Sequence, residues 1–523
     1  LYFVASDKRI IYSYKFDIVS GKLSKKKVFI KVPKKRGYPD GICTDTDGGV
    51  WVAYWNGGCV IRHFPNGKID KIINLPIKKK YKYRNIILNA YKLLQYTVLL
   101  LVATIINIPE ALAEHHENVI DTGDTAWIIT ATALVLFMTI PGLSLFYGGL
   151  VNSKNVVSTI MQCFTICCMA SVLWLFGAYS LSFSDGAGLN KYLGGLDNFL
   201  LNNMEWNALS GTIPENVFFM FQMTFAIITP ALMVGAYVER IKFSSVMFIS
   251  GVWLFAVYAP VTHWIWGGGW LSDLGILDFA GGLVVHTTAG VSALVIAILL
   301  GNRDEFPGRV KPPHSPGLVM AGAAMLWVGW YGFNGGSALA ANANAGMAIL
   351  VTHIAAATAS LTWMAIDWYK NGKPGLVGMV TGTIAGLATI TPASGYVDPQ
   401  SGFIIGLLAG SICYYCAGLI KKTFKIDDSL DVFAVHGVGG MLGIVLVGFL
   451  ANESIGGTAG LLEGNSGQVT TQIIGAVAVV AWSIIATYII VKIANSIFGL
   501  RVSKKDAGDG LDITTHGERG YHL

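Results

Sequence analysis

The chain has 523 residues, of which 53% are hydrophobic and only 13% are charged. Soluble domains carry about 25% charged residues, so this composition excludes an ordinary soluble enzyme. The formal net charge is +6, but the positions of the charged residues between the apolar runs are more informative than this sum. We expect no nucleic-acid partner.

Residues 1–77 differ from the rest of the chain, because short apolar runs alternate there with Gly, Asp and Asn turns, a pattern typical of propeller-like sheet. The stretch 39–58 resembles the C-terminal blades of the SMP-30/gluconolactonase family, and Asp40 matches one of that family's metal ligands. A divalent site needs several ligands, and the others would lie upstream of Leu1. We therefore interpret this part as a truncated β fragment, or a gene-model fusion, that neither binds metal nor hydrolyses a lactone.

Residues 78–113 combine a basic stretch, Lys78–Arg84, with an apolar run from Leu93 and an Ala-Leu-Ala ending at Ala113. This order is typical of a secretory signal peptide, although it lies inside the chain. Cleavage would leave a mature protein that begins near Glu114. Retention would add one more anchoring helix.

From about residue 121 to 498, apolar runs of about 20 residues recur, which is the length that crosses a bilayer core of about 30 Å. The pattern predicts an all-α polytopic membrane protein and not a β-barrel, which would show strands of about 10 alternating residues. Eleven spans are expected, starting near Trp127, Val157, Val217, Ser245, Gly281, Leu318, Met347, Gly375, Phe403, Val432 and Ile473.

Loop charges give these spans a direction. One set of alternate loops is basic, with Lys154, Arg240, Lys242, Arg303, Arg309, Lys311, Lys370, Lys373, Lys421, Lys422, Lys425, Arg501, Lys504 and Lys505. The opposite set is acidic, with only Lys191 against Asp185, Asp197, Glu205, Glu215, Asp273, Asp398, Glu453 and Glu463. The positive-inside rule therefore predicts a multi-pass protein of the inner (plasma) membrane whose residues 499–523 are cytoplasmic.

Two histidines lie in matching apolar contexts, both reading Val-His-x-x-x-Gly: His286 in the fifth span and His436 in the tenth. Because five is an odd number, the two helices run in opposite senses, which predicts an inverted repeat of five and five spans, plus one, with a site near the bilayer midplane. Ionisable residues inside a membrane are costly and therefore functional candidates. The pair indicates that a protonatable or hydrogen-bonding species crosses here.

Long motifs in the same part of the chain resemble the ammonium transporter family (Amt/Mep/Rh). They run in order from Asp121 to the C-terminus: Thr132–Leu150, Trp266-Gly-Gly-Gly, Leu277–Gly282, Gly329–Ser337, Asp431–Gly437 and Gly499–Val502. The resemblance implies eleven helices, a pore in each subunit of a homotrimer surrounded by membrane lipid, and ammonium or ammonia as substrate. It implies no enzymatic activity, no cofactor and no metal.

The resemblance also assigns residues to an external recruitment site. Trp266 and Phe221 match its aromatic walls, and a cation over such a ring gains about 2 kcal/mol when it is desolvated. Ser337 matches a hydroxyl that accepts an N–H from ammonium, and Asp278 matches an aspartate that organises the adjoining loop. For Trp266 the alternative is an interfacial belt residue. Gln222 and Trp330 lie beside these positions and are weaker candidates.

Phe225 and Phe333 match stacked rings that close the pore below this site, and His286 and His436 match a histidine pair that lines it. An apolar lumen disfavours a bare cation, whereas imidazole can accept a proton and hydrogen-bond ammonia. The alternatives are core packing for the phenylalanines and a metal pair for the histidines, which lack a third ligand at metal spacing. Cys413-x-x-Cys416 is interpreted as small packing residues.

The tail 499–523 resembles the family's cytoplasmic regulatory segment, which in bacterial relatives receives PII-type proteins. Polar and glycine-rich, it would be disordered by composition. Three other functions remain open at this point. They are an ammonium sensor on the same fold, a lactonase formed by residues 1–77, and a gas channel for carbon dioxide.

Overall fold

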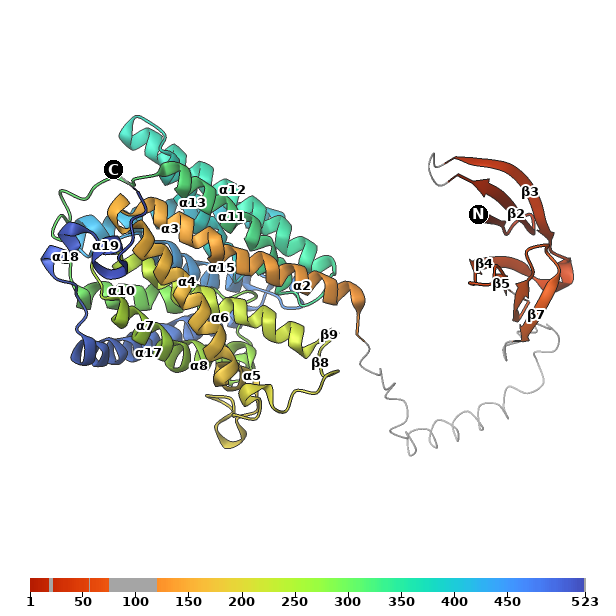
Figure 1. The fold of residues 1–523 in the computed structure, drawn as a ribbon, viewed down its shortest axis with the longest axis horizontal. Coiled ribbons are helices and arrows are strands. Elements are labelled where there is room, and N and C mark those ends of the chain that lie inside the picture. Colours follow the sequence, from red (N-terminus) through yellow and green to blue (C-terminus); the bar gives the residue numbers. More distant parts are fainter. Residues whose placement is uncertain (18–21, 56, 75–119, 522–523) are drawn as a thin grey trace. The chain divides into compact units, whose positions relative to one another are not determined.

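The computed structural model describes residues 1–17, 22–55, 57–74 and 120–521. They belong to two compact units, divided between Glu114 and His115 (Figure 1). The basic stretch and the signal-peptide-like segment expected over 78–113 lie outside the described residues. Each unit is considered by itself.

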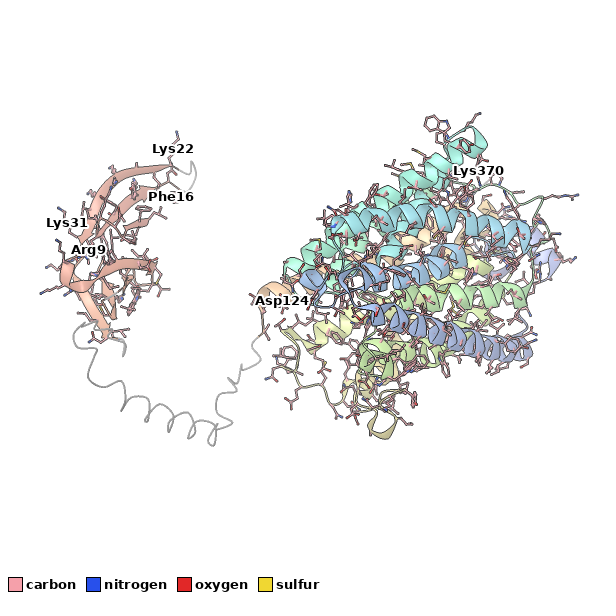
Figure 2. The ribbon with its side chains drawn as sticks, turned by 180° about the vertical axis from the view of Figure 1, so that it is seen from behind. Arg9, Phe16, Lys22, Lys31, Asp124 and Lys370 are labelled. Carbon is pink, nitrogen blue, oxygen red and sulfur yellow. The ribbon has the colours of Figure 1, made fainter. Side chains whose placement is uncertain are left out.

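The N-terminal unit consists of two small antiparallel sheets. Its strands follow one another in the orders β1-β2-β3 and β4-β5-β6-β7, and they are β1 (Tyr2–Ala5), β2 (Ile10–Phe16), β3 (Leu23–Lys31), β4 (Tyr38–Thr44), β5 (Val50–Trp55), β6 (Cys59–His63) and β7 (Ile69–Asn74), with η1 (Lys34–Arg36) before β4. Alternate residues such as Val50, Val52 and Ile61 face a small core. Figure 2 shows Phe16 and Lys31 at the surface of this unit. The expected small sheets are therefore present.

The second unit is helical. Among the described residues, ten segments are long and apolar enough to cross a membrane: Thr122–Leu150, Ser153–Phe183, Glu215–Tyr237, Phe243–Asp273, Gly282–Leu300, Pro316–Gly335, Ala343–Asn371, Pro399–Thr423, Phe433–Leu450 and Ser466–Phe498. The span expected near Gly375 corresponds to α13 (Leu376–Ile390), an apolar helix that is shorter than the others. The chain is thus a multi-pass helical membrane protein.

Most of these segments are built from several helical elements in sequence. The first half contains α2 (Thr122–Phe137), η3 (Met138–Leu143), α3 (Ser144–Leu150), η4 (Ser153–Asn155), α4 (Val156–Leu173), η5 (Trp174–Ala178), α5 (Tyr179–Phe183), α6 (Glu215–Tyr237), α7 (Phe243–Trp253), η8 (Leu254–Tyr258), α8 (Ala259–Trp266), α9 (Trp270–Asp273), η9 (Gly282–Thr287) and α10 (Thr288–Leu300). The second half contains α11 (Pro316–Trp330), η10 (Tyr331–Gly335), α12 (Ala343–Asn371), α13, α14 (Pro399–Gly418), η11 (Leu419–Thr423), η12 (Phe433–Gly437), α15 (Val438–Leu450) and α17 (Ser466–Phe498).

Short elements connect the segments at both ends. They are η6 (Ala187–Leu189), η7 (Phe199–Leu201), the hairpin of β8 (Leu209–Ser210) and β9 (Ile213–Pro214), α16 (Glu453–Gly456), η13 (Leu461–Glu463), α18 (Lys504–Asp509) and α19 (Leu511–His516). Acidic side chains cap several helix starts, as is common at N-cap positions: Asp121 accepts from Asp124 N, and Asp398 accepts from Ser401 N. Figure 2 places Lys370 near the end of α12, where its Nζ lies 4.1 Å from the Tyr415 ring centroid.

Helix α17 begins earlier than the sequence suggested. We expected a start near Ile473, but the polar stretch from Ser466 is already helical. The reason is that its glutamines bond a neighbouring loop: Gln472 accepts from Leu277 N at 2.9 Å and donates to Leu277 O at 2.7 Å. These bonds satisfy backbone groups that burial would otherwise leave unpaired.

The two histidine-bearing helices cross at unusually short range. A Cβ on Gly290 would overlap the backbone of Gly437, and a Cβ on Gly440 would meet Gly282 O at 2.6 Å and His286 Cβ at 2.9 Å. Each of Gly290 and Gly440 stands four residues after a histidine and therefore on the same helix face. The glycine of the Val-His-x-x-x-Gly motif thus leaves the space into which the other helix packs.

This crossing generates a stability prediction. We expect Gly290→Ala to lower the melting temperature of the purified protein, because the added methyl overpacks a backbone contact at a cost of about 1–3 kcal/mol. The matched control is Gly346→Ala on α12, where a Cβ meets no atom within 4 Å. That change should leave the melting temperature equal or slightly higher, because alanine favours helix over glycine. Equal melting of Gly290→Ala and the wild type would contradict the close crossing.

Candidate functional site

The crossing brings the two predicted histidines into direct contact. His286 of η9 and His436 of η12 lie with their Nδ1 atoms 3.2 Å apart, and their rings are nearly parallel at a centroid distance of 5.2 Å. Both side chains are buried, with exposed fractions of 1% and 4%. The sequence placed them in different halves of the chain, and the structure makes them one unit.

The contact restricts the protons of the pair. A hydrogen bond between two nitrogens needs one donor and one acceptor, so one proton lies between the two Nδ1 atoms. With both rings neutral, one Nε2 is then a free acceptor and the other carries a hydrogen. Within the described residues, Nε2 of His286 has no hydrogen-bond partner. The pair can therefore offer both a donor and an acceptor to a small molecule beside it.

A narrow apolar cavity adjoins the two rings. Its volume is about 10 Å³, and its walls are Met138, Leu143, Phe146, Ile228, Leu232, Val285, His286, Leu326, Trp330, Phe333, Ile384 and His436. A volume of this size holds about one water-sized molecule. The two imidazoles are the only ionisable side chains among these walls, so a bare cation here would lose its hydration without a counter-charge.

Aromatic rings continue from the histidines toward one end of the unit. The His286 ring stacks near Trp330 and Phe333, at centroid distances of 5.5 and 6.0 Å. Phe333 lies 4.3 Å from Phe225, and Phe225 lies 5.9 Å from Trp266. Phe225 and Phe333 are each 1% exposed, so two buried rings connect the His286 ring to Trp266.

The partly exposed end of this series carries Trp266 and Ser337. Ser337 Oγ donates to Phe333 O at 2.8 Å, so the oxygen keeps lone pairs that can accept a hydrogen from a ligand. Trp266 Nε1 donates to Asp278 O at 2.8 Å, which fixes the indole. Phe221 is fully buried, with its ring centroid 5.1 Å from that of Phe225.

Gln222 and Trp330, the two weaker candidates, both lie near this series. Trp330 is in ring contact with Phe333 and donates its indole N–H to Thr391 Oγ1 at 2.9 Å. Gln222 is buried on α6 next to Phe221, and its Oε1 has no partner within the described residues. Trp330 therefore has a fixed place in the cavity wall, and Gln222 retains an unused acceptor.

Asp278 organises the start of the His286 helix. Its carboxylate accepts hydrogen bonds from the backbone N–H groups of Gly281, Gly282, Leu283 and Val284, at 2.6 to 3.2 Å. Burial raises the pKa of Asp278 to about 6, although these four N–H groups favour the charged form. The carboxylate satisfies donors that a buried helix start leaves unpaired.

The corresponding residue of the other histidine helix is Asp428, which the sequence analysis did not single out. It accepts from Val432 N at 3.1 Å and Phe433 N at 2.7 Å, and burial raises its pKa to about 6. Asp278 precedes His286 by eight residues, and Asp428 precedes His436 by eight. This equal spacing was the signal in the sequence that could have identified Asp428.

Wide π-helical turns carry both histidines and the Phe333 ring. They are η9, η12 and η10, and Thr287 Oγ1 supports the first by donating to Gly282 O at 2.8 Å. Such turns often occur at functional sites because they displace side chains from the regular helical face. Residue pattern alone gave no indication of them.

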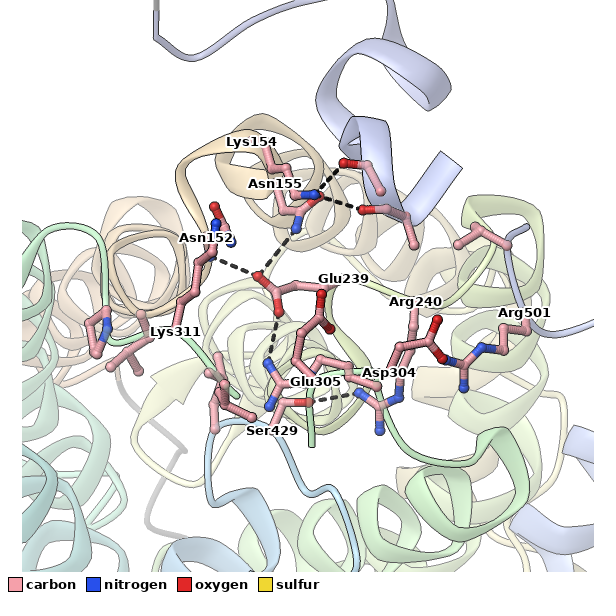
Figure 3. Close-up of a pocket in the computed structure, with 18 of the residues that line it drawn as sticks. Asn152, Lys154, Asn155, Glu239, Arg240, Asp304, Glu305, Lys311, Ser429 and Arg501 are labelled. Atoms are coloured by element: carbon pink, nitrogen blue, oxygen red, sulfur yellow. Dashed lines mark hydrogen bonds and ion pairs between the residues drawn. The ribbon is translucent and has the colours of Figure 1, made fainter. Parts of the chain in front are cut away.

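A second, polar cavity of about 370 Å³ lies at the end of the unit where the predicted basic loops meet (Figure 3). Arg303, one of its lining residues, forms ion pairs with Asp427 at 2.8 Å and with Glu239 at 2.7 Å. Burial opposes ionisation of Asp427, but its bonds to Arg303 outweigh burial and hold the pKa of the carboxyl below its usual range. Within the described residues, no three His, Cys, Asp or Glu side chains are placed to hold a metal ion.

The tail covers part of this end and is ordered, contrary to what its composition suggested. Three hydrogen bonds hold helices α18 and α19 in place. Lys154 Nζ donates to Ala507 O, Leu511 N donates to Asn155 Oδ1, and Ser158 N donates to Asp512 Oδ1 at 2.8 Å. Figure 3 shows Lys154 reaching the tail backbone. Disorder was wrong because these contacts depend on partners more than 350 residues away.

Comparison with known proteins agrees with this geometry. Residues 126–521 match the Ammonium Transporter Family, and residues 1–82 match the SMP-30/Gluconolactonase/LRE-like region. The ammonium transporter Amt1 of Archaeoglobus fulgidus is 46% identical over 400 residues, which cover 76% of this chain and 99% of the relative. The ammonium transporter of Aquifex aeolicus is 43% identical, with coverages of 81% and 99%.

Solved structures give the same result. Mep2 of Saccharomyces cerevisiae superposes with a TM-score of 0.70 at 37% identity, covering 74% of this chain and 90% of that one. A sensor Amt protein also superposes with a TM-score of 0.70, at 30% identity and coverages of 75% and 98%. The named curated relatives are transporters and not enzymes. The chain therefore belongs to the ammonium transporter family.

Proposed function

We propose that this protein moves ammonium across the membrane by recruiting the cation at Trp266, Phe221 and Ser337 and passing ammonia along the histidine pair. The observation that carries the proposal is the contact of His286 with His436 beside an otherwise apolar cavity. Ammonium can shed a proton, and the neutral molecule then avoids the desolvation penalty of a charge in this lumen. Potassium cannot do so.

Recruitment depends on two groups at the partly exposed end, an aromatic ring face and a hydroxyl oxygen. The Trp266 face attracts a cation, and Ser337 has acceptor lone pairs because its hydrogen is used on Phe333 O. An ammonium ion can donate an N–H to that oxygen, which a monovalent metal ion cannot. The buried Phe225 and Phe333 rings form the gate between this site and the histidines.

Several features of the larger assembly are part of the proposal. We place the mouth with Trp266 outside and the tail at the cytoplasmic face of the inner membrane, because the basic loops gather around the tail. Eleven spans in an inverted five-plus-five repeat are supported by the equal spacing of Asp278 and Asp428 from their histidines. A homotrimer and a PII-type partner on the cytoplasmic face rest on the family resemblance.

Residues 1–77 are proposed as a partial β fragment without lactonase activity. Asp40, the position matched to a metal ligand, is exposed, and the described part of the unit holds no cluster of metal-binding side chains. Residues 78–113 are proposed as a linker and signal-like segment. The N-terminal residue of the purified protein decides between cleavage near Glu114 and an intact chain.

An ammonium sensor is the second candidate function, because a sensor Amt protein shares the fold at 30% identity. The transporter relatives are more similar, at 43% and 46%. Ammonium-dependent uptake into proteoliposomes distinguishes the two functions, and parallel current recordings show whether the proton accompanies the nitrogen.

The first functional prediction concerns the histidine pair. We expect His286→Ala with His436→Ala to lower ammonium uptake about 100-fold or to abolish its selectivity over potassium, because general acid–base groups contribute about 10²–10⁴-fold to proton transfer. Uptake into proteoliposomes at equal protein content measures the effect. The control is His314→Gln, a histidine that bonds Val151 O far from the cavity, which should retain selectivity. Unchanged uptake and selectivity in the double variant would exclude the relay.

The second prediction concerns recruitment. Trp266→Leu should raise the KM for ammonium by about 30-fold, the equivalent of about 2 kcal/mol of lost cation–π attraction, and Ser337→Ala should reduce discrimination against potassium. Trp368→Leu is the matched control, because Trp368 is 56% exposed on α12. Concentration dependence of uptake gives KM. A KM for Trp266→Leu within twofold of the wild type would argue against recruitment at this indole.

The third prediction separates the two aspartates. Asp278→Asn and Asp428→Asn should each lower thermal stability, since a hydrogen bond to a charged group contributes about 1.5–3 kcal/mol. Only Asp278→Asn should also raise KM, because the carboxylate of Asp278 holds the loop whose backbone carbonyl, Asp278 O, accepts from Trp266 Nε1.

The pH dependence has a definite sign. Because the pKa of Asp278 is raised to about 6, its carboxylate is charged above and neutral below that pH. In the wild type, KM should therefore rise as external pH falls through about 6, and the Asp278→Asn variant should lack this rise. A KM that is flat in the wild type from pH 5 to 7 would contradict the role of the charge.

A further inference from the structure

His263 is a buried histidine that the transport path does not use. It lies on α8, three residues before Trp266, and its exposed fraction is 0%. Both ring nitrogens face backbone carbonyl oxygens: Nδ1 lies 3.0 Å from Ser182 O, and Nε2 lies 2.6 Å from Asn190 O. Each of these oxygens can only accept a hydrogen bond.

This arrangement specifies the charge of the ring. A neutral imidazole has one N–H donor and one lone pair, and a lone pair at such a distance from a carbonyl oxygen is repelled. Both contacts are hydrogen bonds only when the ring carries two hydrogens, as an imidazolium. The two oxygens also suit a cation, because Ser182 lies in the last turn of α5 and Asn190 directly follows η6. Carbonyls at helix C-termini are partly negative.

The same contacts tie an external loop to the helix that carries Trp266. We call residues 185–192 the strap. Three consecutive strap carbonyls accept hydrogen bonds from the α8–α9 region: Asn190 O from His263, Lys191 O from Trp270 N at 3.0 Å, and Tyr192 O from Trp264 Nε1 at 2.7 Å. Trp266 lies between these anchors. Of the three bonds, only the one from His263 depends on protonation.

Gly267 leaves room for the contact between the His263 ring and Ser182 O. A Cβ at this position would overlap Ser182 O and would lie 2.7 Å from His263 Nδ1. The first glycine of Trp266-Gly-Gly-Gly is therefore required for the Ser182 carbonyl to reach the imidazole. This links the motif beside the recruitment site to His263.

The other titratable and charged groups around His263 lie on the elements packed against α8. Their titratable and charged side chains are Tyr179 of α5, Tyr258 of η8, Asp273 of α9, His286 of η9, and Asp185, Lys191 and Tyr192 of the strap, with Asp278 before η9. Tyr179 OH donates to Glu215, and Asp278 is bonded to backbone N–H groups. Both His263 bonds go to backbone oxygens.

We propose that His263 is an imidazolium that positions Trp266 by clamping the strap to α8. A ring with only one hydrogen would lose one of the two contacts, the strap would loosen, and the indole would lose its fixed position. His263 is a positioning residue in this role, and its effect on uptake rests on the proposed recruitment of ammonium at Trp266.

Solid-state ¹⁵N spectroscopy of histidine-labelled protein in lipid vesicles tests the charge without any transport. With His263 assigned through Thr262 and Trp264, both ring nitrogens should give protonated signals at pH 7. A signal from an unprotonated ring nitrogen at that pH would overturn the proposal. This result is independent of whether the protein transports ammonium.

The split between KM and kcat tests the positioning role. His263→Gln, which can donate from one nitrogen only, should raise the KM for ammonium by about tenfold while kcat stays within about twofold of the wild type, because the lost charged hydrogen bond holds Trp266 and not the pore. His314→Gln is the control and should keep the wild-type KM. An unchanged KM in His263→Gln, or a fall in kcat without a change in KM, would overturn the role.

Discussion

The close crossing of two helices at Gly290 and Gly440 is the contact on which the site depends. Each glycine occupies the face on which its histidine stands, so the opposite backbone fills the space of a missing side chain. The approach brings the two Nδ1 atoms to 3.2 Å. A larger residue at either position would separate the rings and divide one proton-sharing unit into two independent histidines.

Charge is placed around the cavity and kept out of it. Asp278 and Asp428 each use their carboxylates on backbone N–H groups at a helix start, so negative charge stands behind each histidine helix and not in the lumen. The walls themselves are apolar apart from the imidazoles. In the proposed path, a cation meets favourable groups at the mouth and an unfavourable interior, and deprotonation resolves the difference.

Sequence reasoning predicted contacts correctly where they are tied to residue identity and spacing. Two Val-His-x-x-x-Gly runs and the Trp266 motif predicted which side chains meet, because a histidine inside an apolar run has few structural explanations. It failed where long-range hydrogen bonds determine whether a polar segment is helical. The early start of α17 depends on Gln472 bonding Leu277, and the order of the tail depends on Asn155 and Lys154. The π-helical turns under His286 and His436 also have no residue signal, since backbone packing produces them.

The charged and polar groups at the two ends of the unit differ, and this difference bears on the direction of the proposed path. At the mouth near Trp266 the ring faces and the Ser337 oxygen remain available to a cation. At the opposite end several basic residues are paired with carboxylates: Arg303 with Asp427 and Glu239, Lys421 with Asp431, and Arg501 with Asp304. In the proposed transport, these paired charges repel less strongly a molecule that leaves the cavity and regains its proton. The same residues would then contribute to the topology and still permit exit.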